Sequence, residues 1–375
     1  MVLLMAAGGT TTYAQDKSTS PLRDRLQAAL DSMQRANGFP GATFSAVLPG
    51  GEQLLLATGI ADSAGMKRMQ PSSRMLSGSI GKTFFAAAVL SLAEQGKIGL
   101  DDPVSKYLGS EPWFHRIPNS RDVTIRMLMN HTSGIEEYYE LGDFMQRLKS
   151  EPYRHWMPVE LFSYVFDRQP LFAAGGGWGY SDTNYLILGY LIEKHTGKKM
   201  YDLARTYALK PNSLKLTEPS LKTQFANLAT GYSRANSPFP CSGPMVKNGQ
   251  LVFSPEFEWT GGGFVSNPGD LARWAKAYYQ LKTAGPQLRK EMREGIKANT
   301  GRDHLYGLGM QIRPGAKGYT YGHSGWYPGY VSDCMYDPVR DLALAIQFNT
   351  DNGKLLRQST EAYLRQLAEI ISAYQ

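Results

Sequence analysis

The chain has 375 residues, 40 basic and 33 acidic side chains, a formal net charge of +7 and a hydrophobic fraction of 42%. These values exclude a disordered or collagen-like polymer, and the longest apolar run is far shorter than the roughly 20 residues that span a bilayer. The positive excess is small and spread along the chain. We therefore expect a globular protein with no transmembrane segment and no nucleic-acid partner.

The N-terminus carries an incomplete export signal. The opening MVLLMAAGGTTTYAQ joins a short apolar stretch to Thr12 and Ala14, which are placed like the small residues before a secretory cleavage site. The basic start of a signal peptide is missing. Residues 1–20 are thus a signal-peptide remnant or a disordered terminus, and the first alternative predicts a periplasmic or secreted protein.

The first predicted elements are a helix and a hairpin. Leu22, Leu26 and Leu30 recur at helical spacing, which indicates an amphipathic helix. Residues 42–48 and 52–58 then form a β-hairpin around a Pro-Gly-Gly turn. Because an isolated hairpin is marginal in water, these strands need partners from elsewhere in the chain.

The partners are expected at the C-terminal end. Strands are predicted at 305–312, 330–336 and 342–348, followed by a closing helix at 355–373. The economical fold is of the α+β class, with one antiparallel sheet of about five strands built from both chain ends and flanked by helices.

The middle of the chain is dominated by helical patterns and Gly/Pro loops. This composition predicts a mostly helical domain inserted into the sheet domain. The expected boundaries are 21–88 and 285–375 for the sheet domain, and 89–284 for the inserted domain.

Metal and disulfide chemistry have little support in the sequence. Cys241 and Cys334 are too few for a disulfide scaffold and lie in no zinc-binding pattern, so one disulfide or two free thiols are both open. Neither H-E-x-x-H nor H-x-H occurs among the six histidines. We expect no metal and no organic cofactor.

The first candidate motif is SIGK, from Ser79 to Lys82, directly before an apolar helix. A lysine three residues after a serine lies on the same face of a helix, so its amine can reach the hydroxyl. The pair can supply a nucleophile with its own base. Alone, S-x-x-K is weak evidence, since a capping serine and a solvated lysine would look the same.

Two further motifs follow. Tyr180 and Asp182 come after a Gly-rich loop, at the start of a predicted helix. Asp182 is either a helix cap or a group that faces a cleft, and Tyr180 could exchange a proton with Ser79.

The third motif is His323, Ser324 and Gly325, which precede the predicted strand that begins at 330. The N–H groups of Ser79 and Trp326 could form a two-donor oxyanion hole.

The order of these motifs resembles that of the penicillin-recognising serine hydrolases, which include class C β-lactamases, D-alanyl-D-alanine carboxypeptidases, esterases and D-aminopeptidases. Matching phrases include LMNHTSG at 128–134, TNYLILGYLIE after Asp182 and GGGFVSNPGDLARW at 261–274. The resemblance extends from about residue 20 to 372. Within the first phrase we expect His131 to be a structural turn residue.

The resemblance implies roles for these residues. Ser79 would be the acylated nucleophile, and Lys82 and Tyr180 would share the proton transfer. The backbone of Ser79 and Trp326 would hold the oxyanion. Four further residues would bind substrate: Asp182, His323, Ser324 and Gly325.

Two positions depart from the family pattern. His323 stands where many β-lactamases have lysine, which favours the carboxypeptidases and esterases. Asp182 stands where many members have asparagine, and a carboxylate there would raise the pKa of Lys82. We therefore expect Lys82 to be an ammonium in the resting enzyme, with the base role shifted toward Tyr180.

The substrate remains open at this stage. We rank hydrolysis of D-alanyl-D-alanine or other D-amino-acid peptides first, short acyl esters second and β-lactams third. A conventional α/β-hydrolase is disfavoured because G-x-S-x-G is absent. The alternative of another class is a non-catalytic protein that binds peptidoglycan fragments.

Overall fold

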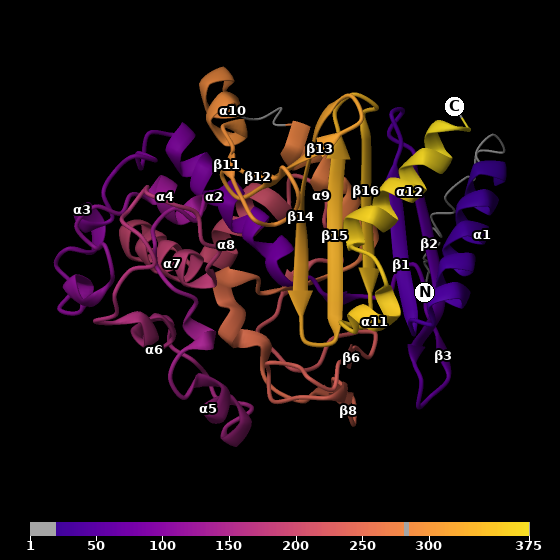
Figure 1. Cartoon of the computed structure of the whole chain (residues 1–375), viewed down its shortest axis with the longest axis horizontal. Helices are drawn as coiled ribbons and strands as arrows, with labels where there is room; N and C mark the ends of the chain where they lie inside the picture. The colour runs from indigo at the N-terminus through magenta and orange to yellow at the C-terminus, as the bar shows by residue number, and fades with distance from the viewer. Residues whose placement is uncertain (1–19, 281–284, 375) are drawn as a thin grey trace, which may run out of the picture.

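The computed structural model describes residues 20–280 and 285–374. The expected export signal before Ser20, with Thr12 and Ala14, lies outside these residues. Both ends of the chain contribute to one antiparallel sheet (Figure 1). Within the described residues its nine strands are, in spatial order, β11 (Ile296–Lys297), β12 (Leu305–Tyr306), β13 (Gln311–Gly315), β14 (Gly318–Tyr327), β15 (Tyr330–Asp337), β16 (Leu342–Phe348), β1 (Gly41–Val47), β2 (Gln53–Asp62) and β3 (Lys67–Arg68).

The predicted fold class is confirmed. β1 and β2 pair around the expected turn, and β16 joins the two chain ends by pairing with β1 on one side and β15 on the other. The sheet is wider than the five strands expected, because short ladders of two residues extend both edges. Such ladders are too short to leave a periodic pattern in the sequence.

Two predicted elements are divided in the structure. The strand expected at 305–312 is broken between β12 and β13, where Gly309 has a φ of 68° and lies against the helix that carries Ala86. The closing helix is interrupted at Arg357, whose φ is 60°, so α11 (Gly353–Leu356) and α12 (Thr360–Ser372) are separate. The Ser359 hydroxyl accepts the Ala362 N–H and caps α12.

The strand β14 is absent from the predicted elements. Its sequence, GYTYGHSGWY, mixes glycines with aromatic and polar residues and shows no alternation of apolar and polar positions. In the structure β14 pairs with β13 up to Gly322 and with β15 along 321–327. From His323 onward, β14 therefore has no β13 partner, and this free edge faces the helical part of the molecule.

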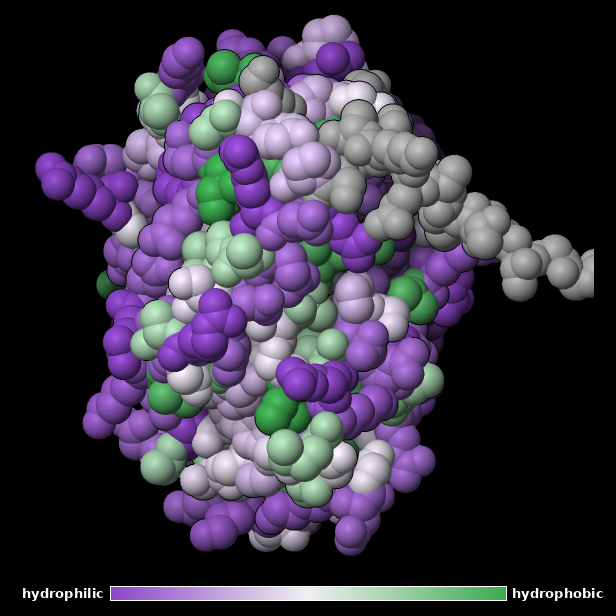
Figure 2. Space-filling view, turned by 90° about the vertical axis from the view of Figure 1, so that its right-hand side faces the viewer, coloured by the Kyte–Doolittle hydropathy of each residue, from purple (hydrophilic) through white to green (hydrophobic). Residues whose placement is uncertain are grey.

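Helices cover both faces of the sheet. α1 (Ser20–Asn37) and α12 bury their apolar residues against one face, and α9 (Pro268–Gln280) packs on the other. Although α9 falls in the stretch expected to belong to the insertion, its Lys276 ammonium donates to the Leu48 carbonyl beside the sheet, at 3.0 Å. Figure 2 shows the side of the molecule on which α1 lies, where hydrophilic residues predominate.

The remaining helices form a second body beside the sheet (Figure 1). No helix of residues 20–280 and 285–374 combines the length and apolar character needed to cross a bilayer. The helices of this body are α3 (Ser105–Leu108), α4 (Ile125–Met129), α5 (Phe144–Ser150), α6 (Pro158–Phe162), α7 (Asp182–Thr196), α8 (Met200–Ala204) and α10 (Pro286–Arg293). Short ladders accompany them: β4 (Met75–Leu76) and β5 (Glu218–Pro219) with β10 (Phe264–Ser266), β6 (Tyr232–Ser233) with β7 (Gly243–Pro244), and β8 (Val246–Lys247) with β9 (Gln250–Leu251).

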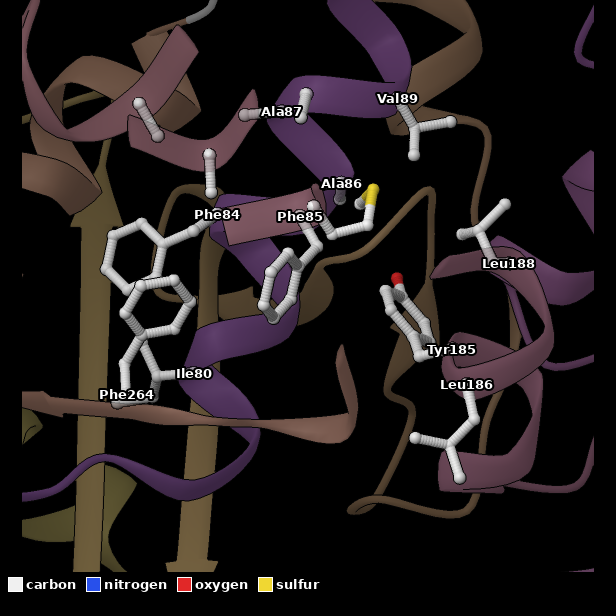
Figure 3. Packing of buried hydrophobic residues seen from close by; sticks show 14 of the residues in the cluster. Ile80, Phe84, Phe85, Ala86, Ala87, Val89, Tyr185, Leu186, Leu188 and Phe264 are labelled. Carbon is white, nitrogen blue, oxygen red and sulfur yellow. The ribbon is translucent and has the colours of Figure 1, made fainter. Parts of the chain in front are cut away.

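Helix α2 (Gly81–Glu94) lies between the two bodies and is buried along its first ten residues. Figure 3 shows Phe84 and Phe85 directed toward Phe264, with ring centroids 4.9 and 5.2 Å from it. An apolar helix of this kind is held by packing on all sides rather than on one stripe. Its N-terminus is therefore fixed in position, at the point where the first candidate motif lies.

Candidate active site

Ser79 lies in a short 3₁₀ helix, η1 (Gly78–Ile80), that leads into α2. Gly78 has a φ of 51°, and a Cβ there would lie 2.6 Å from the Trp326 nitrogen and 2.4 Å from its oxygen. Only glycine permits this approach. The turn therefore holds Ser79 beside the free edge of β14.

Lys82 is completely buried and makes three hydrogen bonds. Its ammonium donates to Ser79 Oγ at 2.9 Å, to Asp182 Oδ1 at 2.5 Å and to the Gly261 carbonyl. Burial acts to lower the pKa of Lys82, but the Asp182 carboxylate and Tyr180 outweigh it and raise the pKa above its ordinary value. This direction agrees with the expectation of a resting ammonium.

Tyr180 also contacts Lys82, whose Nζ lies 4.9 Å from the centre of the phenol ring. The hydroxyl is buried and makes no hydrogen bond to the described residues. Burial raises the pKa of Tyr180 to about 12, against the opposing effect of the Lys82 charge. His131 stacks on the ring at 4.2 Å and has a φ of 63°, in keeping with the expected turn.

Asp182 is the first residue of α7, and its backbone N–H donates to Glu137 Oε2 at 2.6 Å. Glu137 is 9% exposed. Burial, followed by the charge of Asp182, raises the pKa of Glu137 well above its usual value. A third carboxyl, Glu258, is also buried near this pair, and burial followed by Asp182 raises its pKa to about 8. Sequence reasoning missed both glutamates, because neither has a diagnostic spacing to the motifs.

The third motif lies inside β14. His323 is 1% exposed, and both ring nitrogens are used: Nε2 contacts the Tyr306 hydroxyl at 2.8 Å and Nδ1 the Ser324 carbonyl at 2.6 Å. Burial, with a contribution from Lys82, lowers the pKa of His323 to about 3. A neutral imidazole in this position supports the strand, and a direct contact with substrate would require one of these hydrogen bonds to break.

Ser324 is half-buried, and the side chain of Gln311 on the neighbouring strand β13 holds it in place. Its Oγ lies 3.1 Å from Gln311 Nε2, and its N–H donates to Gln311 Oε1 at 3.3 Å. Gln311 Oε1 also accepts from Arg313, which forms a buried ion pair with Asp333 at 3.0 Å. These three supporting residues carry no recognisable motif, and sequence reasoning missed them.

The free edge of β14 meets η1 at Gly325 and Trp326. A Cβ at Gly325 would lie 1.9 Å from the Ser77 carbonyl oxygen, so only glycine fits there. In antiparallel strands the paired residues alternate between exchanging hydrogen bonds and pointing outward. The pair next to the turn is Tyr327 with Tyr330, which leaves the Trp326 N–H directed away from β15.

The structure thus brings the three motifs to one place. Ser79 and Lys82 come from η1 and α2, Tyr180 and Asp182 from the start of α7, and Trp326 from β14. A hydroxyl with a charged hydrogen-bond donor, a buried phenol and two nearby backbone N–H groups can support nucleophilic attack on a carbonyl.

Other side chains of the described chain add no metal or disulfide chemistry. Cys241 and Cys334 are both free thiols. Across residues 20–280 and 285–374, no three His, Cys, Asp or Glu side chains converge as metal ligands would.

Known proteins resemble this chain over most of its length. The profile of the Beta-lactamase family matches residues 26–369. Penicillin-binding protein 4* of Bacillus subtilis (strain 168) is 26% identical over 317 residues, which cover 82% of this chain and 67% of that protein. The D-aminopeptidase of Brucella anthropi is also 26% identical over 317 residues. The aligned region covers 84% of this chain but only 57% of that protein.

Solved structures share the fold over almost the whole chain. The D-stereospecific amidohydrolase from Streptomyces sp. has a TM-score of 0.75 and 27% identity, with 89% of this chain and 97% of that one covered. The D-amino acid amidase from Ochrobactrum anthropi SV3 superposes with a TM-score of 0.79 over 94% and 99% of the two chains, but at 23% identity it supports the fold alone. The chain therefore belongs to the Beta-lactamase family and is a serine hydrolase of that family.

Proposed function

We propose that the protein hydrolyses peptides or amides of D-amino acids through an acyl-enzyme on Ser79. The observation that carries this proposal is the hydrogen bond of Ser79 Oγ to the buried Lys82 ammonium, beside the backbone of Trp326. The relatives named as a D-aminopeptidase and a D-stereospecific amidohydrolase support the choice of substrate class. Short esters rank second and β-lactams third.

In the proposed reaction Ser79 Oγ forms a bond to the substrate carbonyl carbon. The carbonyl oxygen becomes an oxyanion that accepts the N–H groups of Ser79 and Trp326. The carbon–nitrogen bond then breaks, the amine leaves with a proton, and the acyl group stays on Ser79. Water then adds to this ester and gives a proton to the Tyr180 phenolate that protonated the amine. The acid is released as Ser79 regains its proton from Lys82, which takes one back from Asp182.

The proton of Ser79 requires an acceptor, and a Lys82 ammonium cannot be one by itself. We propose that Lys82 passes a proton to Asp182 as it accepts the proton of Ser79. The distances of 2.5 and 2.9 Å support both transfers, and the positive charge that stays on Lys82 balances the negative charge of the oxyanion. Tyr180, with a pKa of about 12, is a neutral phenol suited to protonating the leaving amine. For the acylation step this differs from the expectation that the base role shifts toward Tyr180.

A comparison of substrates tests the proposal. We would measure kcat/KM for D-phenylalanine amide, a D-Ala-D-Ala peptide, a nitrophenyl ester and a chromogenic cephalosporin, with Ser79→Ala as the control. A D-amino-acid substrate should have the highest value and its L-enantiomer a value lower by about 100-fold or more, on the order that a stereospecific site can supply. Equal values for both enantiomers, or turnover that survives in Ser79→Ala, would contradict it.

The rival function is a non-catalytic protein that binds peptidoglycan fragments. It predicts binding of D-amino-acid peptides with no turnover and no covalent adduct. We further propose that the enzyme acts outside the cytoplasm, as the N-terminal residues suggest. Cell fractionation that finds the mature chain in the cytoplasm, still beginning at Met1, would contradict that location.

A further inference from the structure

A cavity of about 410 Å³ adjoins the oxyanion edge and has no role in the mechanism above. It lies between η3 (Tyr138–Glu140), α5, the segment after β6 and the end of β14. The residues that line it are Tyr139, Glu140, Met145, Arg234, Pro238 and Trp326. Four of the six are apolar or aromatic, so the two charged side chains dominate its polar chemistry.

Arg234 is the cation of this cavity, and its guanidinium is free. Its carbon Cζ lies 5.9 Å from the centre of the Trp326 ring. Within the described residues, the side chain forms no ion pair and donates no hydrogen bond, although its Nε is buried. Only the backbone N–H of Arg234 is engaged, with Asp351 Oδ1 at 2.7 Å. A buried donor without a partner is costly, and a ligand that accepts from it would remove the cost.

The guanidinium of Arg234 determines what kind of ligand fits. Its five N–H donors lie in one plane. Because the side chain donates no hydrogen bond within the described residues, these donors are available to a ligand that lies beside the Trp326 ring. A planar fork of donors matches the two oxygens of a carboxylate. Trp326 also supplies the proposed oxyanion N–H, so a group bound by Arg234 would lie within one residue's reach of the reacting carbonyl.

We propose that this cavity is a substrate subsite that binds a carboxylate through Arg234, so that the preferred substrates carry an acidic group next to the bond that is cleaved. The inference rests on the proposed function, because it assigns the cavity to the substrate of Ser79. Glu140, exposed at the rim, repels a second anion and limits the subsite to one acidic group.

Two matched substrate pairs test the subsite, since a carboxylate could lie on either side of the bond. D-Glu-p-nitroanilide and D-Gln-p-nitroanilide differ only in an acyl-side carboxylate. The C-terminal amides of D-Ala-D-Glu and D-Ala-D-Gln differ only in a leaving-group carboxylate. We expect kcat/KM to favour the acidic member of one pair by about tenfold or more, the usual strength of a charge-assisted hydrogen bond.

Variants of Arg234 and Glu140 test whether this cavity causes the preference for the acidic substrate. In Arg234→Gln the ratio within the favoured pair should fall to about one, and in Arg234→Lys it should be intermediate, since lysine keeps the charge and loses the planar fork. Glu140→Gln should raise the ratio. Arg302→Gln removes the same charge from a side chain that is 97% exposed, in a loop beside β12, and should leave the ratio unchanged. Thermal unfolding confirms that each variant is folded.

A ratio that is the same in wild type and Arg234→Gln for both pairs would overturn the subsite. Failure of the proposed function looks different: no substrate of either pair is cleaved. In that case calorimetric titration with the α-amides of D-glutamate and D-glutamine decides the matter. Binding of the D-glutamate amide that is weakened tenfold in Arg234→Gln supports the subsite, and equal binding of both ligands to wild type contradicts it.

Discussion

Two buried ion pairs flank β14, and they differ in what surrounds them. Lys82 and Asp182 lie on the cleft side, with side chains 0% and 15% exposed, and their hydrogen bonds include the Ser79 hydroxyl. Arg313 and Asp333 lie behind the strand at 2% and 1% exposure, enclosed by protein on every side. The first pair can exchange a proton with a reacting group, whereas the second can only hold its neighbours in place.

The comparison teaches that burial alone does not identify a catalytic charge. Both pairs suffer the desolvation cost of leaving water, and each is compensated by its partner. The two pairs differ in the group to which each cation donates a further hydrogen bond. Lys82 donates to the Ser79 hydroxyl, the proposed nucleophile. Arg313 donates to Gln311, which in turn donates to the Ser324 hydroxyl. The following variants separate these two functions.

Lys82→Met should have the largest effect on activity. Without the ammonium, Ser79 loses the group that accepts its proton, and kcat/KM should fall by about 10³-fold or more, as for other essential members of a catalytic set. Asp182 is left without its ammonium partner but is 15% exposed, so the loss of stability should be smaller than the roughly 3–5 kcal/mol typical of a fully buried pair. Kinetics and urea unfolding measure the two quantities. A large loss of stability with little loss of activity would show that Lys82 has a structural and not a catalytic role.

Arg313→Met should have the opposite profile. It leaves Asp333 buried and unpaired, which typically costs about 3–5 kcal/mol in unfolding free energy. The double variant Arg313→Met with Asp333→Leu should recover most of that loss, because no buried charge is left alone. Urea unfolding checks both. If the double variant is as unstable as the single one, packing rather than charge explains the position.

Asp182→Asn should alter the pH dependence. In wild type the pKa of Lys82 is raised and the proton can pass to Asp182. In the variant the amine itself must be neutral, so kcat/KM should rise with pH through the Lys82 pKa. We expect the acidic limb to move to higher pH by about one unit or more, and activity at pH 7 to fall about 10- to 100-fold. A limb that coincides with wild type, or moves to lower pH, would contradict the relay.

Gln311→Glu should have the smallest effect. Because Arg313 can only donate, Gln311 Oε1 faces it and Nε2 donates to Ser324 Oγ at 3.1 Å, while the serine hydroxyl donates to Oε1 over a longer distance of 3.5 Å. A carboxylate at 311 has no donor for Ser324 and accepts its proton more strongly, so KM should rise by about tenfold with little change in kcat. Gln311→Met, which accepts no proton, should raise KM less. Equal KM values in both variants would show that the amide orientation is unimportant.

The sequence allowed much of the fold and the central site to be predicted. Ser79 and Lys82 have helical spacing, and the resemblance placed Tyr180 and Trp326 beside them. Gln311 and Glu137 could not be found, because their contacts depend on tertiary packing and follow no spacing along the chain. The strand β14 was missed for a related reason: Gly325 serves a close contact with Ser77, just before η1, and Gly322 one with Cys334 of β15, so neither follows a periodic pattern.

Acylation of residue 79 tests the central claim most directly. The intact mass of the protein would be followed after mixing with an activated D-phenylalanine ester, and the modified peptide identified by fragmentation. The account predicts a transient mass increase of one acyl group on the peptide that contains Ser79, absent from Ser79→Ala. Turnover without any adduct, or an adduct on another residue that persists in Ser79→Ala, would contradict it.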